Sequence, residues 1–321
     1  MIKKLIVCTV ALICLACLLV PVIDSYEDEH EAAIDRLEVL VIEGQSNAAY
    51  RNANVSLVNQ EIDLPSHNAY YYGTDSAPIY YGQTPETGGP TYDETFESYS
   101  IHSMVEGNKW KIGGYEPILA KYISDKTGND VLIINAGISG ASIQYLQPDA
   151  DGGEYVAEVI AHALADIDPK YTVDKVGYMW LQGEANRWME IDEYIAYFDV
   201  VNAWNISQGF DEGYIVQTRP YNGMQASDAQ IKMCNEIPNI VLSSTAPSTF
   251  TVDNGKLALD NIHYSQWGRI IVAEDVCDTL QLPEPQKFTS GELSLLKIVP
   301  LLVIVGILIV AVGWIALRRQ D

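Results

Sequence analysis

The sequence predicts an α/β fold: a three-layer sandwich in which a five-stranded parallel sheet lies between two layers of helices. Short apolar runs of strand length alternate with amphipathic segments of helix length over most of residues 37–282. The apolar runs are nearly continuous, which is typical of strands buried on both faces. Alternating strands and helices indicate βαβ units, and right-handed crossovers place the helices on both faces of a parallel sheet.

Each predicted strand is a buried apolar run, and the first, at residues 37–42, reads LEVLVI. The strands are predicted at residues 37–42, 131–135, 176–181, 214–218 and 240–243. The helices between and after them are predicted at residues 117–126, 155–166, 191–208, 227–236 and 266–280. Single α/β domains commonly reach about 200–250 residues. Residues 37–282 therefore fit one domain, and they contain no internal repeat.

Residues 68–111 do not follow this alternation. The segment has little periodicity and is rich in tyrosine, with Tyr70, Tyr71, Tyr72, Tyr80, Tyr81, Tyr92 and Tyr99. An insertion of this size without regular structure is uncommon in a compact domain and is often functional. Tyrosine rings, which are apolar with a polar tip, suit the faces of sugar rings. Alternatively, the tyrosines cover the edge of the sheet, and the sequence leaves both interpretations open.

The N-terminal end is predicted to enter or cross a membrane. Lys3 and Lys4 precede a long apolar run, which is typical of a secretory signal. Residues 1–23 are therefore predicted to be a signal peptide or an N-terminal anchor. Residues 21–25 offer no clear cleavage site, so the choice between the two stays open. An acidic linker is predicted at residues 24–36.

The C-terminal end predicts a membrane anchor. Residues 298–317 carry no charge and are long enough to cross a bilayer as a helix. Arg318 and Arg319 follow, and the positive-inside rule places them, within the tail 318–321, in the cytoplasm. The expected location is the cell membrane, with residues 283–297 as a stalk and the α/β domain outside the cytoplasm.

Composition excludes some functions. The chain has 43 acidic and 19 basic residues and a formal net charge of −24, which repels phosphate backbones, so nucleic acid is not an expected partner. There is no metal-binding motif and no phosphate-binding loop, so no metal and no cofactor are predicted. Of the five cysteines, only Cys234 and Cys277 lie in the domain, and the sequence does not decide whether they form a disulfide.

A candidate nucleophile follows the first strand, in the run Gly44-Gln45-Ser46-Asn47. A serine in a glycine-containing turn between a strand and a helix can expose its hydroxyl, and its own N–H can face an oxyanion. Taken alone, the run is more typical of a helix cap.

A candidate base and its partner lie before the last helix, where Asp260 and His263 stand three residues apart in a turn. The carboxylate can orient the imidazole, and the imidazole can take the proton of Ser46.

Two further polar stretches follow buried strands. Gln182-Gly183-Glu184 comes after the strand at 176–181, and its amide and carboxylate are costly to bury without partners, which indicates a cavity. The Gly-rich turn at residues 137–140 follows the strand at 131–135 and offers free backbone N–H groups.

Together these motifs resemble the SGNH (GDSL-type) hydrolases, specifically their sialate O-acetylesterase-like and acetylxylan-esterase-like branch. That branch carries Gly-Gln-Ser-Asn, Gln-Gly-Glu and Asp-x-x-His blocks in this order, and the resemblance covers residues 37–282. It implies a flavodoxin-like SGNH hydrolase fold and a serine esterase. By this resemblance Ser46 is the nucleophile, His263 the general base and Asp260 its orienting partner. The implied oxyanion hole consists of the N–H groups of Ser46 and Gly140 and the side-chain amide of Gln182.

The substrate expected from this resemblance is an acetylated carbohydrate. Gln45, Asn47, Glu184 and Asn186 are predicted to contact it. Two alternatives stay open: a surface module that binds glycans without catalysis, and a lipid or thioester hydrolase on the same fold. The sequence identifies neither the sugar nor the acetylated hydroxyl.

Overall fold

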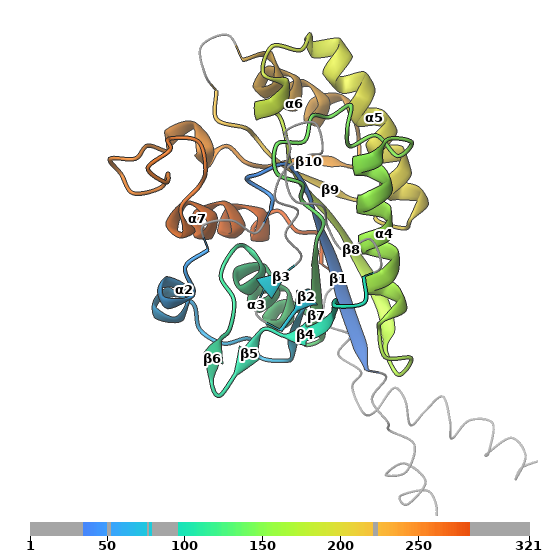
Figure 1. Cartoon of the computed structure of the whole chain (residues 1–321), viewed down its shortest axis with the longest axis vertical. Coiled ribbons are helices and arrows are strands. Elements are labelled where there is room, and N and C mark those ends of the chain that lie inside the picture. Colours follow the sequence, from blue (N-terminus) through green and yellow to red (C-terminus); the bar gives the residue numbers. More distant parts are fainter. Residues whose placement is uncertain (1–34, 50–52, 76, 79–95, 221–223, 283–321) are drawn as a thin grey trace, which may run out of the picture. The chain divides into compact units, whose positions relative to one another are not determined.

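An eight-stranded sheet lies at the centre of the protein, in the order β10-β9-β8-β1-β7-β2-β3, with β4 paired to β2 (Figure 1). The computed structural model describes residues 35–49, 53–75, 77–78, 96–220 and 224–282. Strands β10 to β2 in this order are parallel, whereas β3 and β4 pair with β2 in the antiparallel direction. The strands of this sheet are β1 (Arg36–Gly44), β2 (Ala69–Thr74), β3 (Ala77–Pro78), β4 (Ser100–Ser103), β7 (Asp130–Asn135), β8 (Thr172–Leu181), β9 (Gly213–Val216) and β10 (Ile240–Ser244).

The five predicted strands are present as β1, β7, β8, β9 and β10, but the prediction of a five-stranded sheet is wrong. The additional strands β2, β3 and β4 come from the tyrosine-rich segment 68–111. Aromatic residues favour strands, but the run Tyr70–Tyr72 shows neither alternation nor a continuous aliphatic stretch, so its periodicity gave no signal. The same segment also forms a small hairpin of β5 (Val105–Glu106) and β6 (Lys109–Trp110).

Helices cover both faces of the sheet (Figure 1). Leu37, Val39 and Val41 of β1 point to one face, where they share a hydrophobic core with α4, α5 and α6. Leu40 and Ile42 are fully buried and point to the opposite face, where α3 and α7 pack. The helices are α2 (Val55–Glu61), α3 (Glu116–Thr127), α4 (Asp151–Ala165), α5 (Ile191–Ser207), α6 (Gln225–Glu236) and α7 (Gln266–Cys277), with short 3-10 turns η2 (Glu184–Asn186) and η3 (Ala246–Thr249). The α/β sandwich with a mostly parallel sheet is thus confirmed.

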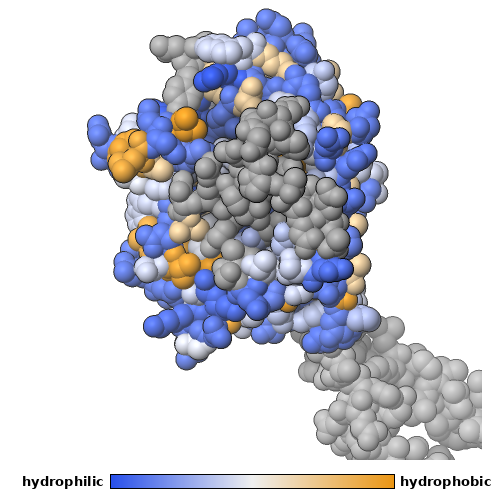
Figure 2. Space-filling model, in the orientation of Figure 1, coloured by the Kyte–Doolittle hydropathy of each residue, from blue (hydrophilic) through white to orange (hydrophobic). Residues whose placement is uncertain are grey.

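The predicted membrane segments at residues 1–23 and 298–317 lie outside the described residues, as do the stalk 283–297 and the tail 318–321. Among the helices that the structure describes, none combines the length and the apolar character needed to span a bilayer. On the face of the molecule in Figure 2 the described residues are mostly hydrophilic, in keeping with the formal net charge of −24.

Two questions that the sequence left open have partial answers in the described residues. Tyr71 and Tyr72 are buried in β2, which supports the interpretation that these two tyrosines cover the sheet. Cys234 and Cys277 are free thiols, and burial raises the pKa of Cys234 to about 12 and that of Cys277 further. Neither thiol is therefore a ready nucleophile near neutral pH.

Glu43, next to the end of β1, is a buried acid on the side of the sheet that α5 covers. Its Oε2 accepts a hydrogen bond from Asn205 Nδ2 at 3.1 Å, and its Oε1 has no partner in the described chain. Burial raises the pKa of Glu43 from 4.5 to about 7, although the Asn205 hydrogen bond opposes this shift. The folded state therefore binds this proton more tightly than the unfolded state. The resulting stability is present at low pH and is lost as the pH rises from about 4.5 to about 7.

Glu43→Gln is expected to make the free energy of unfolding less dependent on pH. A tenfold change in proton affinity corresponds to about 1.4 kcal/mol. Ionisation of Glu43 should therefore lower the free energy of unfolding of the wild type by up to about 3 kcal/mol across that pH range, and the variant should show no such decrease. Urea unfolding at several pH values measures this, with Glu158→Gln, an exposed acid on α4, as the matched control. Equal pH dependence in Glu43→Gln and the wild type would contradict the expectation.

Candidate active site

The loops that follow β1, β7 and β8 lie side by side, because β1 is the middle strand of these three. Gln45 donates its backbone N–H to Leu181 O at 2.9 Å, which joins the end of β1 to the end of β8. Ile138 donates to Gly44 O at 2.9 Å, which joins the loop after β7 to the same turn. The predicted motifs therefore meet at the carboxyl edge of the sheet, where open parallel sheets bind ligands.

Ser46 lies in the turn directly after β1 and is 6 % exposed. Within the described chain, its backbone N–H donates no hydrogen bond, and the same holds for the N–H of Gly140, an exposed residue with φ +82°. The loop of Gly140 is close to the Ser46 turn: a Cβ on Gly137 would lie 2.6 Å from Ala49 N. Two of the three predicted oxyanion donors are thus unoccupied and on adjoining loops.

Asp260 and His263 form a closed turn before α7. His263 Nδ1 and Asp260 Oδ2 lie 2.7 Å apart, while Asp260 Oδ1 accepts the backbone N–H groups of Ile262 and His263, each at 3.0 Å. Asn261 takes a left-handed conformation, φ +58°, which lets so short a segment fold back on itself. The aspartate and the histidine that the sequence paired are therefore in direct contact.

This turn fixes the proton on the imidazole. Burial alone would raise the pKa of Asp260, but the hydrogen bonds from His263 and from the two N–H groups lower it to about 2. An ionised carboxylate only accepts hydrogen bonds, so Nδ1 carries the proton in the neutral imidazole. Nε2 is then left as a proton acceptor, which is what a general base requires.

The Ser46 turn and the His263 turn are joined through Asn47. Tyr264 donates its N–H to Asn47 Oδ1 at 3.0 Å. In the described chain the Ser46 hydroxyl makes no hydrogen bond to His263. Such catalytic contacts are commonly long without substrate.

Gln182, the third predicted oxyanion donor, is fully buried and already engaged. Its Nε2 donates to Asn186 Oδ1 and, at 3.3 Å, to Ala141 O. Its Oε1 is buried without a hydrogen-bond partner in the described residues. Asn186 Oδ1 also accepts Ile143 N–H at 2.7 Å, so Asn186 holds the Gln182 amide against the loop of Gly140.

The four residues predicted to contact substrate have side-chain partners within the protein. Gln45 Oε1 accepts Ala185 N–H at 3.0 Å, and Asn47 Nδ2 donates to Glu184 Oε1 at 2.8 Å. Asn186 is bonded as described above. Gln45, Asn47 and Asn186 are almost completely buried. Their contact with a substrate stays a prediction.

Several buried residues behind the Ser46 turn were not predicted from the sequence. Tyr115 Oη donates to Asn47 O at 2.8 Å, and Arg269 donates to the same oxygen at 3.2 Å with its guanidinium over the Tyr115 ring. Asn135 donates to Ala48 O at 3.0 Å and to Glu116 Oε1 at 2.8 Å. These contacts fix the backbone that carries Ser46. Glu116 and Arg269 are charged residues of helices, which normally face water, so the sequence gave no signal for these two.

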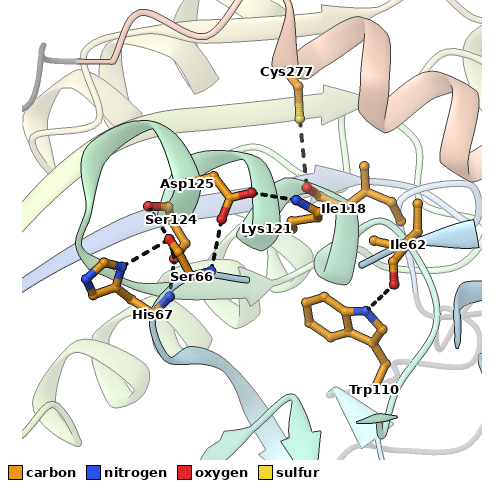
Figure 3. Close-up of polar contacts among 9 residues, drawn as sticks. All are labelled: Ile62, Ser66, His67, Trp110, Ile118, Lys121, Ser124, Asp125 and Cys277. Atoms are coloured by element: carbon orange, nitrogen blue, oxygen red, sulfur yellow. Dashed lines mark hydrogen bonds and ion pairs between the residues drawn. The ribbon is translucent and has the colours of Figure 1, made fainter. Parts of the chain in front are cut away.

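A second group of serine, histidine and aspartate side chains, at α3, has no catalytic geometry (Figure 3). Ser66 Oγ lies 3.1 Å from His67 Nδ1, but Asp125 binds Ser66 N–H and Lys121 rather than the imidazole. The group anchors the segment that leads into β2.

A cleft of about 580 Å³ lies beside Asp260. Leu259 and Trp267, which line it, are 94 % and 39 % exposed. Its lining includes Asp260 but neither Ser46 nor His263. The sequence analysis did not predict that Leu259 and Trp267 line this cleft. Their position beside the Asp260–His263 turn is the signal that could have indicated it.

No protein-family model matches the chain, and no curated protein matches its sequence. Solved structures do match its fold. The crystal structure of NanS aligns with a TM-score of 0.51 at 16 % identity, covering 76 % of this chain and 96 % of that chain. The fold is that of the SGNH-type hydrolases. The resemblance that the motifs predicted is therefore confirmed at the level of the fold.

Two other solved structures align with this chain at lower TM-scores. A carbohydrate acetylesterase from Xanthomonas citri aligns at a TM-score of 0.46 and 15 % identity, covering 76 % of this chain and 57 % of that chain. A lipase/acylhydrolase from Enterococcus faecalis aligns at 0.39 and 10 % identity, covering 76 % and 94 %.

Proposed function

We propose that this protein is a serine esterase that removes O-acetyl groups from carbohydrate through Ser46, His263 and Asp260. The observation that carries the proposal is the closed turn in which Asp260 accepts three hydrogen bonds and orients the His263 imidazole. The SGNH-type fold and the motif resemblance support it, because Ser46 follows the first strand, in the run that matches the family's Gly-Gln-Ser-Asn block.

In the first half-reaction, Ser46 Oγ attacks the acetyl carbonyl carbon while His263 Nε2 takes the hydroxyl proton. The carbonyl oxygen becomes an oxyanion, which the free N–H groups of Ser46 and Gly140 stabilise. Asp260 stabilises the imidazolium that forms. His263 then gives its proton to the departing sugar oxygen, which leaves acetyl-Ser46 and a sugar with a free hydroxyl.

In the second half-reaction, water attacks the acetyl carbonyl, and His263 takes a proton from it. The new tetrahedral intermediate collapses to acetate, and His263 returns the proton to Ser46 Oγ. Gln182 is proposed as the third oxyanion donor. To act in this way, its amide has to share or exchange the hydrogen bond that it gives to Asn186.

We propose a carbohydrate rather than a lipid substrate on two grounds. The net charge of −24 and the mostly hydrophilic surface disfavour adsorption to an anionic lipid interface. Leu259 and Trp267 in the cleft beside Asp260 suit the C–H face of a sugar ring. We further propose that the enzyme acts outside the cytoplasm, held at the cell membrane by residues 298–317.

Treatment of the full chain with a fluorophosphonate is expected to label Ser46, because the probe captures a serine that a general base activates. Peptide mass spectrometry identifies the site. In parallel, p-nitrophenyl acetate is expected to be hydrolysed faster than p-nitrophenyl octanoate, and an acetylated sugar is expected to release acetate.

Each alternative gives a different result in the same experiment. A glycan-binding module should bind sugar but neither react with the probe nor hydrolyse any ester. A lipid or thioester hydrolase should be labelled at Ser46 but should prefer octanoate to acetate. Either pattern would overturn the proposal.

A further inference from the structure

One side chain beside Ser46 holds the backbone on both sides of His263. Asn47 is fully buried, and its Oδ1 accepts the N–H of Tyr264 at 3.0 Å. Its Nδ2 donates to Ile262 O at 3.4 Å. Ile262 and Tyr264 are the two neighbours of His263, so Asn47 determines where the imidazole stands relative to the nucleophile.

Glu184 fixes the direction in which the Asn47 amide points. Asn47 Nδ2 donates to Glu184 Oε1 at 2.8 Å, whereas Glu184 Oε2 is buried without a hydrogen-bond partner in the described residues. Burial raises the pKa of Glu184, and the Asn47 hydrogen bond and the nearby His263 oppose this rise. An oxygen of Glu184 accepts from the amide nitrogen, which leaves Asn47 Oδ1 turned toward Tyr264.

The main chain of Asn47 is held from the opposite side. Its carbonyl oxygen accepts hydrogen bonds from Tyr115 Oη at 2.8 Å and from Arg269 at 3.2 Å. The residue therefore has little freedom to move, and its polar side-chain atoms are already occupied by Glu184, Ile262 and Tyr264.

We propose that Asn47 and Glu184 are positioning residues: Glu184 orients the Asn47 amide, and Asn47 presents His263 to Ser46. This assignment rests on the proposed esterase function. It competes with the sequence-based hypothesis that the two residues contact the sugar.

Asn47→Ala and Glu184→Ala in the full chain are expected to lower kcat by about 10²-fold, the loss that a misplacement of about 1 Å causes. The loss should be the same for p-nitrophenyl acetate, which has no sugar, and for an acetylated sugar, with KM little changed. A sugar-binding role predicts instead a higher KM for the acetylated sugar alone, and that result would overturn the proposal.

Glu184→Gln keeps an oxygen that accepts from Asn47 and is expected to restore most of the activity that Glu184→Ala loses. Asn202→Ala removes a buried asparagine that bonds to Tyr178 and Asn239, neither of them a residue of the site, and controls for a loss of stability alone. It should lower the melting temperature and leave kcat unchanged. Activity in Glu184→Gln as low as in Glu184→Ala would contradict the positioning role.

A double-mutant cycle with His263→Ala tests whether Asn47 acts through His263. Asn47→Ala is expected to cause no further loss in the His263→Ala background. An additional loss of about 10²-fold there would overturn the inference. The failure of the proposed function looks different: the wild type itself would then show no hydrolysis that depends on Ser46.

Discussion

If Ser46 is the nucleophile, Ser46→Ala is expected to lower kcat for an acetyl ester by about 10⁵- to 10⁶-fold, as the loss of the nucleophile does in serine hydrolases. The residual activity reflects the N–H groups of Ser46 and Gly140, which the substitution leaves in place. The Ser46 hydroxyl makes no hydrogen bond in the described chain, so its removal should change the melting temperature little. Initial rates with p-nitrophenyl acetate, measured on the full chain, give the comparison.

Ser142→Ala is the matched control, because Ser142 lies in the loop after β7 and its hydroxyl accepts the N–H of Tyr145 as its one hydrogen bond within the described residues. This variant should retain wild-type kcat. If Ser46→Ala and Ser142→Ala hydrolyse the ester equally well, another group performs the chemistry and the serine mechanism is wrong.

The parallel part of the fold could be predicted because burial on both faces leaves a local signature. β1, β7 and β8 each contain a largely apolar run, and the apolar residues of the helices between them recur at helical spacing. β2 has no such signature. Tyr71 and Tyr72 are buried in a strand that pairs with β7 and β4, and a local pattern cannot show a partner that is distant in sequence.

In the candidate site, too, local features could be predicted and contacts between residues distant in sequence could not. Ser46, Asp260 and His263 could be proposed because each stands in a short motif at a predicted strand end or before a helix. The contact between Asp260 and His263 is local and follows from their spacing of three. The role of Asn47 is not local: its partners Ile262 and Glu184 lie 215 and 137 positions away.

Buried charge was the least predictable feature. Arg269 on α7 and Glu116 on α3 are both fully buried behind the Ser46 turn, where they help to hold its backbone. In the sequence, nothing distinguishes these two residues from other charged residues of helices, which are normally solvated. Only the three-dimensional arrangement of α3 and α7 shows that they support the site.

Gly44→Ala is expected to abolish stable folding or to lower the free energy of unfolding by more than about 4 kcal/mol, a size that indicates a specific steric cause. Gly44 ends β1 at φ +129°, and a Cβ there would lie 2.1 Å from Leu181 O and 2.5 Å from Leu181 C. These are backbone atoms of β8, so no side chain can turn away to relieve the overlap. The two strands would have to separate where Gln45 N–H donates to Leu181 O.

Gly255→Ala is the control that measures the backbone strain of a positive φ without the steric overlap expected at Gly44. Gly255 also has a positive φ, +73°, but a Cβ there would meet nothing within 4 Å. The control should therefore lose only about 1–2 kcal/mol, the cost of a left-handed conformation. Thermal unfolding of both variants of the full chain gives the test, and equal losses would contradict the proposed overlap. Any Gly44→Ala protein that folds should have a lower kcat as well, because separation of β1 from β8 moves Ser46 away from Gln182. Gly44→Ala would then lower both stability and kcat, since the contact that joins β1 to β8 also positions the Ser46 turn.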